Sequence, residues 1–154
     1  MEGKIYNQKR NDLRKRIGDE MTVGHSGVLE RSLDSAKQFI RITKDGKVEV
    51  LPEEQLIGTD RILLYLIGKL YAKEAGFADV DDVGNKELME ELQIPEGFLL
   101  PWLKELRDEN KIKQSERERS VYYTKRERYV LYSIPVNLVE ATLKSIKDKL
   151  EEGS

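Results

Sequence analysis

The segment from Asn85 to Tyr132 constrains the fold of this chain most, because it predicts a helix, a tight turn, a second helix and then strands, in that order. Asn85 can cap the first helix, and the residues that follow it are mostly strong helix formers. Leu88, Met89 and Leu92 recur at the three-and-four spacing of one buried face. The first of the two helices is therefore expected to be short and amphipathic.

A turn and a second helix follow. Pro95 and Gly97 both interrupt helices, so they predict the turn. Pro101 lacks a backbone N–H and clashes with the preceding turn of a helix, so we expect the second helix to begin at about Leu100. Asn110 can close this helix in the left-handed conformation. The buried face, on which we expect Trp102 to lie in the core, consists of Leu99, Trp102, Leu103 and Leu106.

Strand-forming residues dominate the next segment. Residues 111–114 begin a strand, and residues 121–124 and 129–132 supply two further β-rich runs around the charged residues 125–128. This pattern predicts a basic β-hairpin directly after the second helix.

The residues before this segment predict a hairpin and a buried helix. An Asp-Gly pair, Asp45 and Gly46, separates two alternating runs at 39–43 and 47–51, which is a strong hairpin signal. One face of this hairpin must be covered, either by the core or by a partner. Residues 59–75 are apolar on most sides, with Thr59 and Asp60 as capping residues and Gly76 at the end, and predict the buried first helix of the domain.

Both ends of the chain carry amphipathic patterns. Leu13, Ile17 and Met21 recur at a spacing of four, which indicates a basic amphipathic helix or a mobile arm, followed by a loop and a short helix. At the other end, Pro135 can occupy a first helical turn. The narrow apolar stripe of the helix that follows consists of Val139, Leu143, Ile146 and Leu150.

The run IPEGFLLPWLKELRDENKIKQ, residues 94–114, resembles the turn, recognition helix and first wing strand of the winged helix-turn-helix family of archaeal and bacterial regulators. The resemblance implies an α+β fold with a three-helix core and a β-hairpin wing. Here that domain would span residues 57–134, after a basic arm at 1–35 and a β-hairpin extension at 36–56, with a C-terminal amphipathic helix at 135–154. Most members of the family bind double-stranded DNA, and some are protein-interaction modules.

The net charge of −2 conceals a segregated distribution. Residues 1–16 carry six basic and two acidic groups, residues 74–110 carry three and eleven, and residues 111–128 carry seven and three. The basic segments can follow phosphates, whereas the acidic one repels them, although charge runs are also common on solvated faces. The residues expected to contact DNA, as in a transcriptional regulator or an architectural protein, are Lys104, Arg107, Lys111, Lys113, Arg117, Arg119, Lys125, Arg126 and Arg128.

The start of the second helix favours protein binding over DNA binding. Arg, Lys, Asn and Gln dominate the readout of bases, yet the positions expected to face DNA there are apolar or acidic. The second hypothesis is therefore a protein-interaction module that uses Phe98, Leu100 and Pro101. The terminal stripe 139–150 is expected to form a homodimer seam, as terminal helices do in winged-helix regulators, or else to pack on its own domain.

Composition argues against most other classes. The chain has 154 residues, no cysteine and one histidine, His25, so we expect no catalytic triad, no metal centre and no cofactor. The acidic run 79–84 matches a calcium loop only in part, since Val83 stands where an oxygen ligand is required. Because the sequence has no long apolar run and no leader pattern, we expect a cytoplasmic protein that does not bind membranes. Because it also lacks catalytic motifs, we expect that it is not an enzyme. Its 36% charged residues are typical of thermophilic proteins and also of ordinary solvated surfaces.

Overall fold

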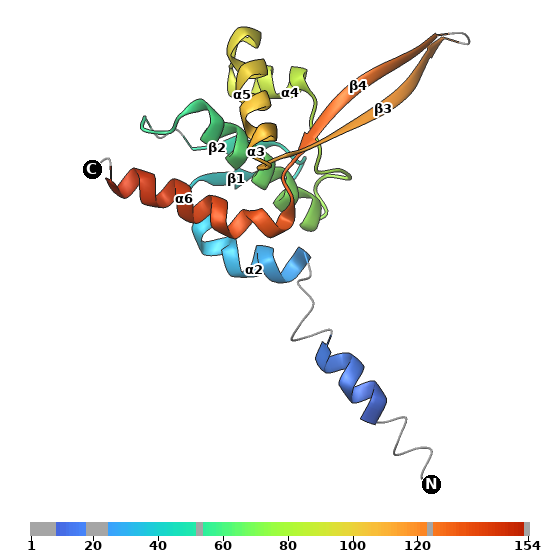
Figure 1. Cartoon of the computed structure of the whole chain (residues 1–154), viewed down its shortest axis with the longest axis vertical. Helices are drawn as coiled ribbons and strands as arrows, with labels where there is room; N and C mark the ends of the chain where they lie inside the picture. Colours follow the sequence, from blue (N-terminus) through green and yellow to red (C-terminus); the bar gives the residue numbers. More distant parts are fainter. Residues whose placement is uncertain (1–8, 18–24, 52–53, 123–124, 153–154) are drawn as a thin grey trace.

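The chain forms helices and two separate antiparallel hairpins, so the predicted α+β class is confirmed (Figure 1). The computed structural model describes residues 9–17, 25–51, 54–122 and 125–152, and only the backbone of residues 25–26, 119–122 and 125–126. A helix at residues 9–17 comes first. The elements that follow are α2 (His25–Ala36), β1 (Ile40–Ile42), β2 (Val48–Val50), α3 (Gly58–Glu74), α4 (Asn85–Leu92), α5 (Glu96–Asp108), β3 (Lys113–Tyr122), β4 (Lys125–Ser133), the 3-10 helix η1 (Val136–Leu138) and α6 (Val139–Glu152).

Helix α3 is the centre of the molecule. It is buried on most sides, as its sequence predicts, and the short hairpin, α4, α5 and α6 all pack against it. Its N-cap residue is Ile57, without a side-chain capping bond, so the expected cap at Thr59 and Asp60 is wrong. Asp60 lies instead in the first turn, where a carboxylate interacts favourably with the helix dipole. Gly76, with φ +81°, follows the end of the helix as predicted.

The short hairpin β1–β2 covers one side of α3. Its strands pair Ile40 with Val50 and Ile42 with Val48, and Gly46 has the left-handed φ of +86° that the Asp-Gly turn requires. The strands come close to the helix at Gly68, where an added Cβ would lie 2.3 Å from a Val48 methyl carbon. The core, rather than a partner, therefore covers the apolar face of this hairpin.

Helices α4 and α5 form the predicted pair, with two differences at their starts. The N-cap position of α4 is Gly84, one residue before the expected Asn85. Helix α5 begins at Glu96, so its expected start at Leu100 is wrong. Pro101 lies inside the helix, and the carbonyl it leaves without a helical partner belongs to exposed Gly97, where solvent can satisfy it. Asn110 closes the helix with φ 58°, as predicted.

The long hairpin β3–β4 leaves the body as an extended ribbon (Figure 1). Of the three expected β-rich runs, residues 113–114 and 121–122 belong to β3, residues 129–132 belong to β4, and residues 123–124 lie outside the described part. The charged residues 125–128 belong to β4. At its base, Val83 and Tyr132 exchange backbone hydrogen bonds of 2.8 and 2.7 Å, so the segment before α4 extends the sheet. This order of α3, bridge, α4, α5 and ribbon is compatible with a winged-helix-like arrangement.

Helix α6 packs against α2 and α3 of the same chain. Val139, Leu143 and Ile146 are at most 1% exposed, so they are core residues, and the expected dimer seam through them is wrong. Leu150, at the end of the stripe, is partly buried against the same core. A stripe at helical spacing shows that a face is buried but does not identify what buries it. Pro135 precedes η1 and does not lie in the first turn of α6.

Two glycine substitutions test the close approach of α3 to the short hairpin. Gly68→Ala should lower the free energy of unfolding by about 1 to 3 kcal/mol, because the new methyl group overlaps Val48. Gly97→Ala is the matched control, since nothing lies within 4 Å of its added Cβ in α5, and it should raise stability by about 0.5 to 1 kcal/mol. Urea unfolding measures both changes. Equal effects of the two substitutions would contradict the close contact.

Candidate nucleic-acid interface

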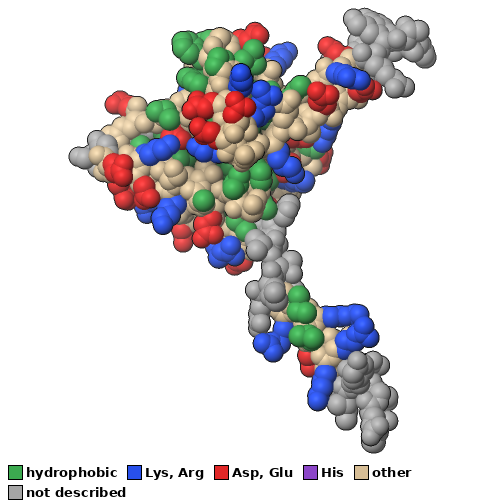
Figure 2. Space-filling view, viewed as in Figure 1, with side chains coloured by type: hydrophobic (Ala, Val, Ile, Leu, Met, Phe, Trp, Pro, Cys, Tyr) green, Lys and Arg blue, Asp and Glu red, His purple; other side chains and the backbone are tan. Residues whose placement is uncertain are grey.

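The candidate interface consists of α5 and the long hairpin, which are joined by the turn at residues 109–112. The structure brings the predicted basic residues together on these two elements. Figure 2 shows that basic and acidic side chains are interspersed along the hairpin, in place of one continuous basic strip. The sequence places the basic residues correctly on these elements, but their pairing with carboxylates has to be read from the structure.

Several of the predicted DNA contacts are engaged within the chain. Arg117 pairs with Asp82 at 2.9 Å, and the Asp82 side chain is only 11% exposed. Arg128 Nε pairs with Glu118 at 3.1 Å, and Lys111 pairs with Glu109 at 2.9 Å. The first and third pairs join these cations to residues outside the ribbon, whereas Arg128 and Glu118 pair across its two strands. All three pairs neutralise part of the positive charge.

Three other predicted contacts lie close to the base of the hairpin. The Arg107 guanidinium donates a hydrogen bond to the side-chain oxygen of Gln114, while its Nε is buried without a partner. Lys104 and Lys113 are exposed, and neither forms an ion pair within the described part of the chain. These two lysines are therefore the free cations nearest to the start of the hairpin.

The distal end of the hairpin differs in charge from its base. The backbone register places Arg119 opposite Glu127, Ser120 opposite Arg126 and Tyr122 opposite Lys125. The side chains of Arg119, Lys125 and Arg126 lie outside the described part. Residues 119–126 contain these three basic residues and no acidic one, whereas the hairpin's carboxylates are at 116, 118 and 127. By sequence, the basic residues of the hairpin therefore outnumber its acidic residues most toward the end of the ribbon.

The outward face of α5 is poorly suited to reading bases. Opposite the buried residues Leu99, Leu103 and Leu106, helical geometry places Gly97, Pro101, Lys104, Glu105 and Asp108. Around the helix Phe98 and Leu100 point about 160° away from each other, with the exposed Pro101 between them, so the expected apolar surface spans a wide arc of the helix. Phe98 and Leu100, which are 59% and 42% exposed, thus lie on opposite flanks.

Phe98 instead contributes to an apolar patch at the start of α3. Its ring lies 5.7 Å from that of Trp102, and Trp102 covers Gly58, where an added Cβ would be 2.2 Å from the indole. Ile57, the neighbour of Gly58, is 54% exposed. Trp102 packs against the core and against α3 as predicted, but it is only partly buried and lies at the edge of the core. We call Ile57, Phe98 and Trp102 the tryptophan patch.

The perturbed tyrosines connect helices and show no feature of a reaction centre. Tyr65 donates a 2.7 Å hydrogen bond to Glu87 in α4, and Tyr71 donates one of 2.7 Å to the Leu29 carbonyl in α2. Burial raises the pKa of Tyr71 to about 12 and, together with Glu87, raises that of Tyr65 further. Both hydroxyls therefore remain protonated donors at neutral pH.

Among the described residues, no three His, Cys, Asp or Glu side chains come together as a metal site. The His25 side chain lies outside the described part. No described helix has both the length and the apolar character needed to cross a membrane. Comparison with models of protein families finds no match, and no curated protein matches the sequence.

A double-mutant cycle tests whether Asp82 anchors the hairpin. The coupling free energy between Asp82→Asn and Arg117→Gln should be about 0.5 to 1 kcal/mol in urea unfolding, because Asp82 is largely buried. The Glu118→Gln and Arg128→Gln pair is the control. Both of its side chains are exposed, so its coupling should be smaller, at roughly 0 to 0.5 kcal/mol. Strict additivity of the Asp82 and Arg117 substitutions would show that this ion pair does not stabilise the fold.

Proposed function

We propose that this protein binds double-stranded DNA, mainly through phosphates, as a winged helix-turn-helix protein. In this assignment α3, α4 and α5 are the three core helices, α5 occupies the position of the recognition helix, and β3–β4 is the wing. The order of the elements and the strand bridge at Val83 support the fold assignment. The proposal includes no catalytic reaction.

The observation that carries the proposal is the excess of basic residues toward the end of the wing, where residues 119–126 include three basic residues and no acidic one. Its ten-residue strand β3 spans roughly 30 Å at about 3.4 Å per residue, so the basic end is held well away from the acidic body. A two-stranded ribbon is narrow enough to enter the major groove. Lysine and arginine there would contact phosphates on either side of the groove and release counterions.

A second basic element supports the same proposal. The helix at residues 9–17 carries Lys9, Arg10, Arg14, Lys15 and Arg16 against one carboxylate, Asp12. All nine residues are exposed, and Figure 2 shows basic side chains around its apolar groups. A helix with this charge can follow a phosphate backbone without reading bases.

The expected binding has little sequence preference. Phosphate contacts position a protein on DNA, whereas contacts with base edges specify a sequence. The outward face of α5 offers Lys104 as its only cation, beside Glu105 and Asp108. A regulator of broad specificity or an architectural protein fits this face better than a reader of one operator.

Titration of a labelled random-sequence duplex at about 50 and 200 mM salt tests the proposal. The triple variant Lys125→Ala, Arg126→Ala and Arg128→Ala should bind more weakly on unrelated sequences. It should also lose roughly one unit of salt slope for each phosphate contact removed. The control is Lys73→Ala, Lys144→Ala and Lys147→Ala, which removes the same charge from exposed positions on α3 and α6.

Two outcomes would contradict the proposal. The first is the absence of duplex binding by the wild-type protein at low salt, where counterion release favours even non-specific contacts. The second is an equal loss of affinity in both triple variants, because that result would reflect net charge alone and give the wing no special role.

The tryptophan patch favours a second candidate function, a protein-interaction module. Phe98 and Ile57 are both more than half exposed, and aromatic groups contribute strongly to desolvated interfaces. Because the α6 stripe is buried within the chain, this patch is the better candidate for the proposed homodimer. The predicted surface residues Leu100 and Pro101 are also exposed, and Pro101 is the i+3 neighbour of Phe98 on α5, so they remain candidates for the edge of this interface.

Sedimentation at tens of micromolar tests this second candidate, since weak interfaces have affinities on the order of that concentration. The wild-type mass should rise with concentration, and Trp102 fluorescence should shift to the blue as the indole loses water. Phe98→Ala should abolish both changes while leaving DNA affinity intact, because an aromatic group contributes little to phosphate contacts. Leu33→Ala, at another exposed leucine, is the control. A wild-type protein that stays monomeric would contradict self-association through the patch.

A further inference from the structure

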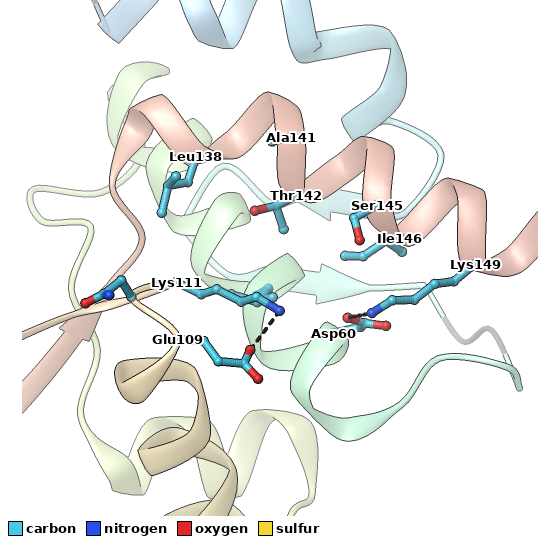
Figure 3. Close-up of a pocket in the computed structure, with 11 residues that line it drawn as sticks. Asp60, Glu109, Lys111, Leu138, Ala141, Thr142, Ser145, Ile146 and Lys149 are labelled. Carbon is cyan, nitrogen blue, oxygen red and sulfur yellow. Dashed lines mark hydrogen bonds and ion pairs between the residues drawn. The ribbon is translucent and has the colours of Figure 1, made fainter.

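A surface pocket of about 220 Å³ lies between α6, the start of α3 and the turn that joins α5 to β3 (Figure 3). Lys111 is the one predicted DNA contact that lines it, and no residue of the tryptophan patch does. The pocket is smaller than the roughly 300 to 1,000 Å³ of sites for drug-sized ligands. Its volume therefore limits any ligand to a small metabolite.

Two ion pairs lie on opposite sides of this pocket. On one side, Lys149 from α6 approaches Asp60 from α3, and on the other, Lys111 pairs with Glu109 at 2.9 Å (Figure 3). Two carboxylates and two ammonium groups give the lining a formal charge of zero. A ligand with one charged group could interact with only the carboxylates or only the ammonium groups of the pocket, whereas a zwitterion can interact with both.

Asp60 is the most unusual of these groups. Its side chain is only 8% exposed, yet it pairs with the half-exposed Lys149, whose Nζ is 3.4 Å away. Charge-assisted hydrogen bonds between an ammonium and a carboxylate are usually about 2.7 to 2.9 Å long. A buried carboxylate with one long contact would gain from a compact ammonium group seated in the pocket.

The rest of the lining fits a small amphipathic molecule. Thr142 and Ser145 project hydroxyl groups from the α6 side of the pocket (Figure 3). Leu63, Leu138 and Ile146 supply the apolar part. Predominantly apolar walls with a few convergent polar groups are typical of metabolite sites.

We propose that this pocket binds a free α-amino acid with an aliphatic side chain. The ligand's ammonium group donates to Asp60, and its carboxylate accepts from Lys111. The side chain rests on the apolar wall. This inference does not depend on DNA binding, because every group it uses belongs to the pocket.

The first test is calorimetry with L-leucine as the probe, together with two analogues that each lack one charge. L-leucinamide keeps the ammonium group and loses the carboxylate, and N-acetyl-L-leucine does the reverse. L-leucine should bind with a Kd on the order of 1 mM or below, and each analogue should bind at least about tenfold more weakly, because each leaves one charged group of the pocket unpaired. Thermal shift with the other aliphatic amino acids then ranks the side chains.

Variants locate the site. Asp60→Asn should abolish L-leucine binding, whereas Asp148→Asn, the same change on an exposed residue of α6 outside this pocket, should leave it unchanged. If Asp60→Asn fails to fold, Lys111→Met serves instead, since Lys111 is half exposed. Lys111→Met should weaken L-leucine binding about tenfold without further weakening L-leucinamide, which has no carboxylate for Lys111 to bind.

Three results would overturn the proposal. The first is that no aliphatic α-amino acid binds at about 10 mM, which is well above the weakest expected Kd. The second is that L-leucine and L-leucinamide bind equally well. The third is that the affinity for L-leucine is unchanged in both Asp60→Asn and Lys111→Met. All three are measured without DNA. Failure here therefore leaves the DNA proposal untouched, and failure of the duplex titration leaves this one untouched.

Discussion

The burial of α3 is the constraint on which the rest of the structure depends. Helix α3 is apolar on most sides, so it has no polar face that could remain in contact with solvent. Burying each of its large side chains stabilises the fold by about 1.5 to 3 kcal/mol. One layer cannot cover such a helix. The short hairpin packs on the side of α3 at Gly68, α6 packs on another side, and α4 and α5 pack on the remaining surface. The positions of α5 and the long hairpin therefore follow from how α3 is covered.

Local signals in the sequence predicted the elements that local physics decides. Asp45 and Gly46 specify a turn because the glycine adopts a positive φ, and Asn110 ends α5 for the same reason. The apolar run of residues 62–70 predicted a buried helix because its length and composition allow little else. In each case the residues that predict the turn or helix are the same residues that form it, so the prediction did not require knowledge of contacts with distant parts of the chain.

The failed predictions depended on partners that are distant in the sequence. The periodicity of α6 was correct, but whether Leu143 meets α2 or another molecule is decided by the path of the whole chain. Pro101 seemed incompatible with a helix from Glu96, yet the carbonyl it leaves free is exposed, so its cost is small. Asp82 and Arg117 are 35 positions apart, and neither residue signals the other in the sequence. A basic residue count therefore overstates how many cations are available to a ligand.

The turn at residues 109–112 connects the two proposed binding regions, but proximity does not establish allostery. Lys111 lines the pocket, and Lys113 begins β3 two residues later, while Ile112 between them is 7% exposed and fixed in the core. A ligand that bound Lys111 without changing the position of Ile112 would leave the hairpin where it is. Coupling requires that the ligand bind two arrangements of this turn with different affinity, and DNA would then alter ligand affinity by the same factor. Because the buried Ile112 opposes a second arrangement, the two binding events should be nearly independent.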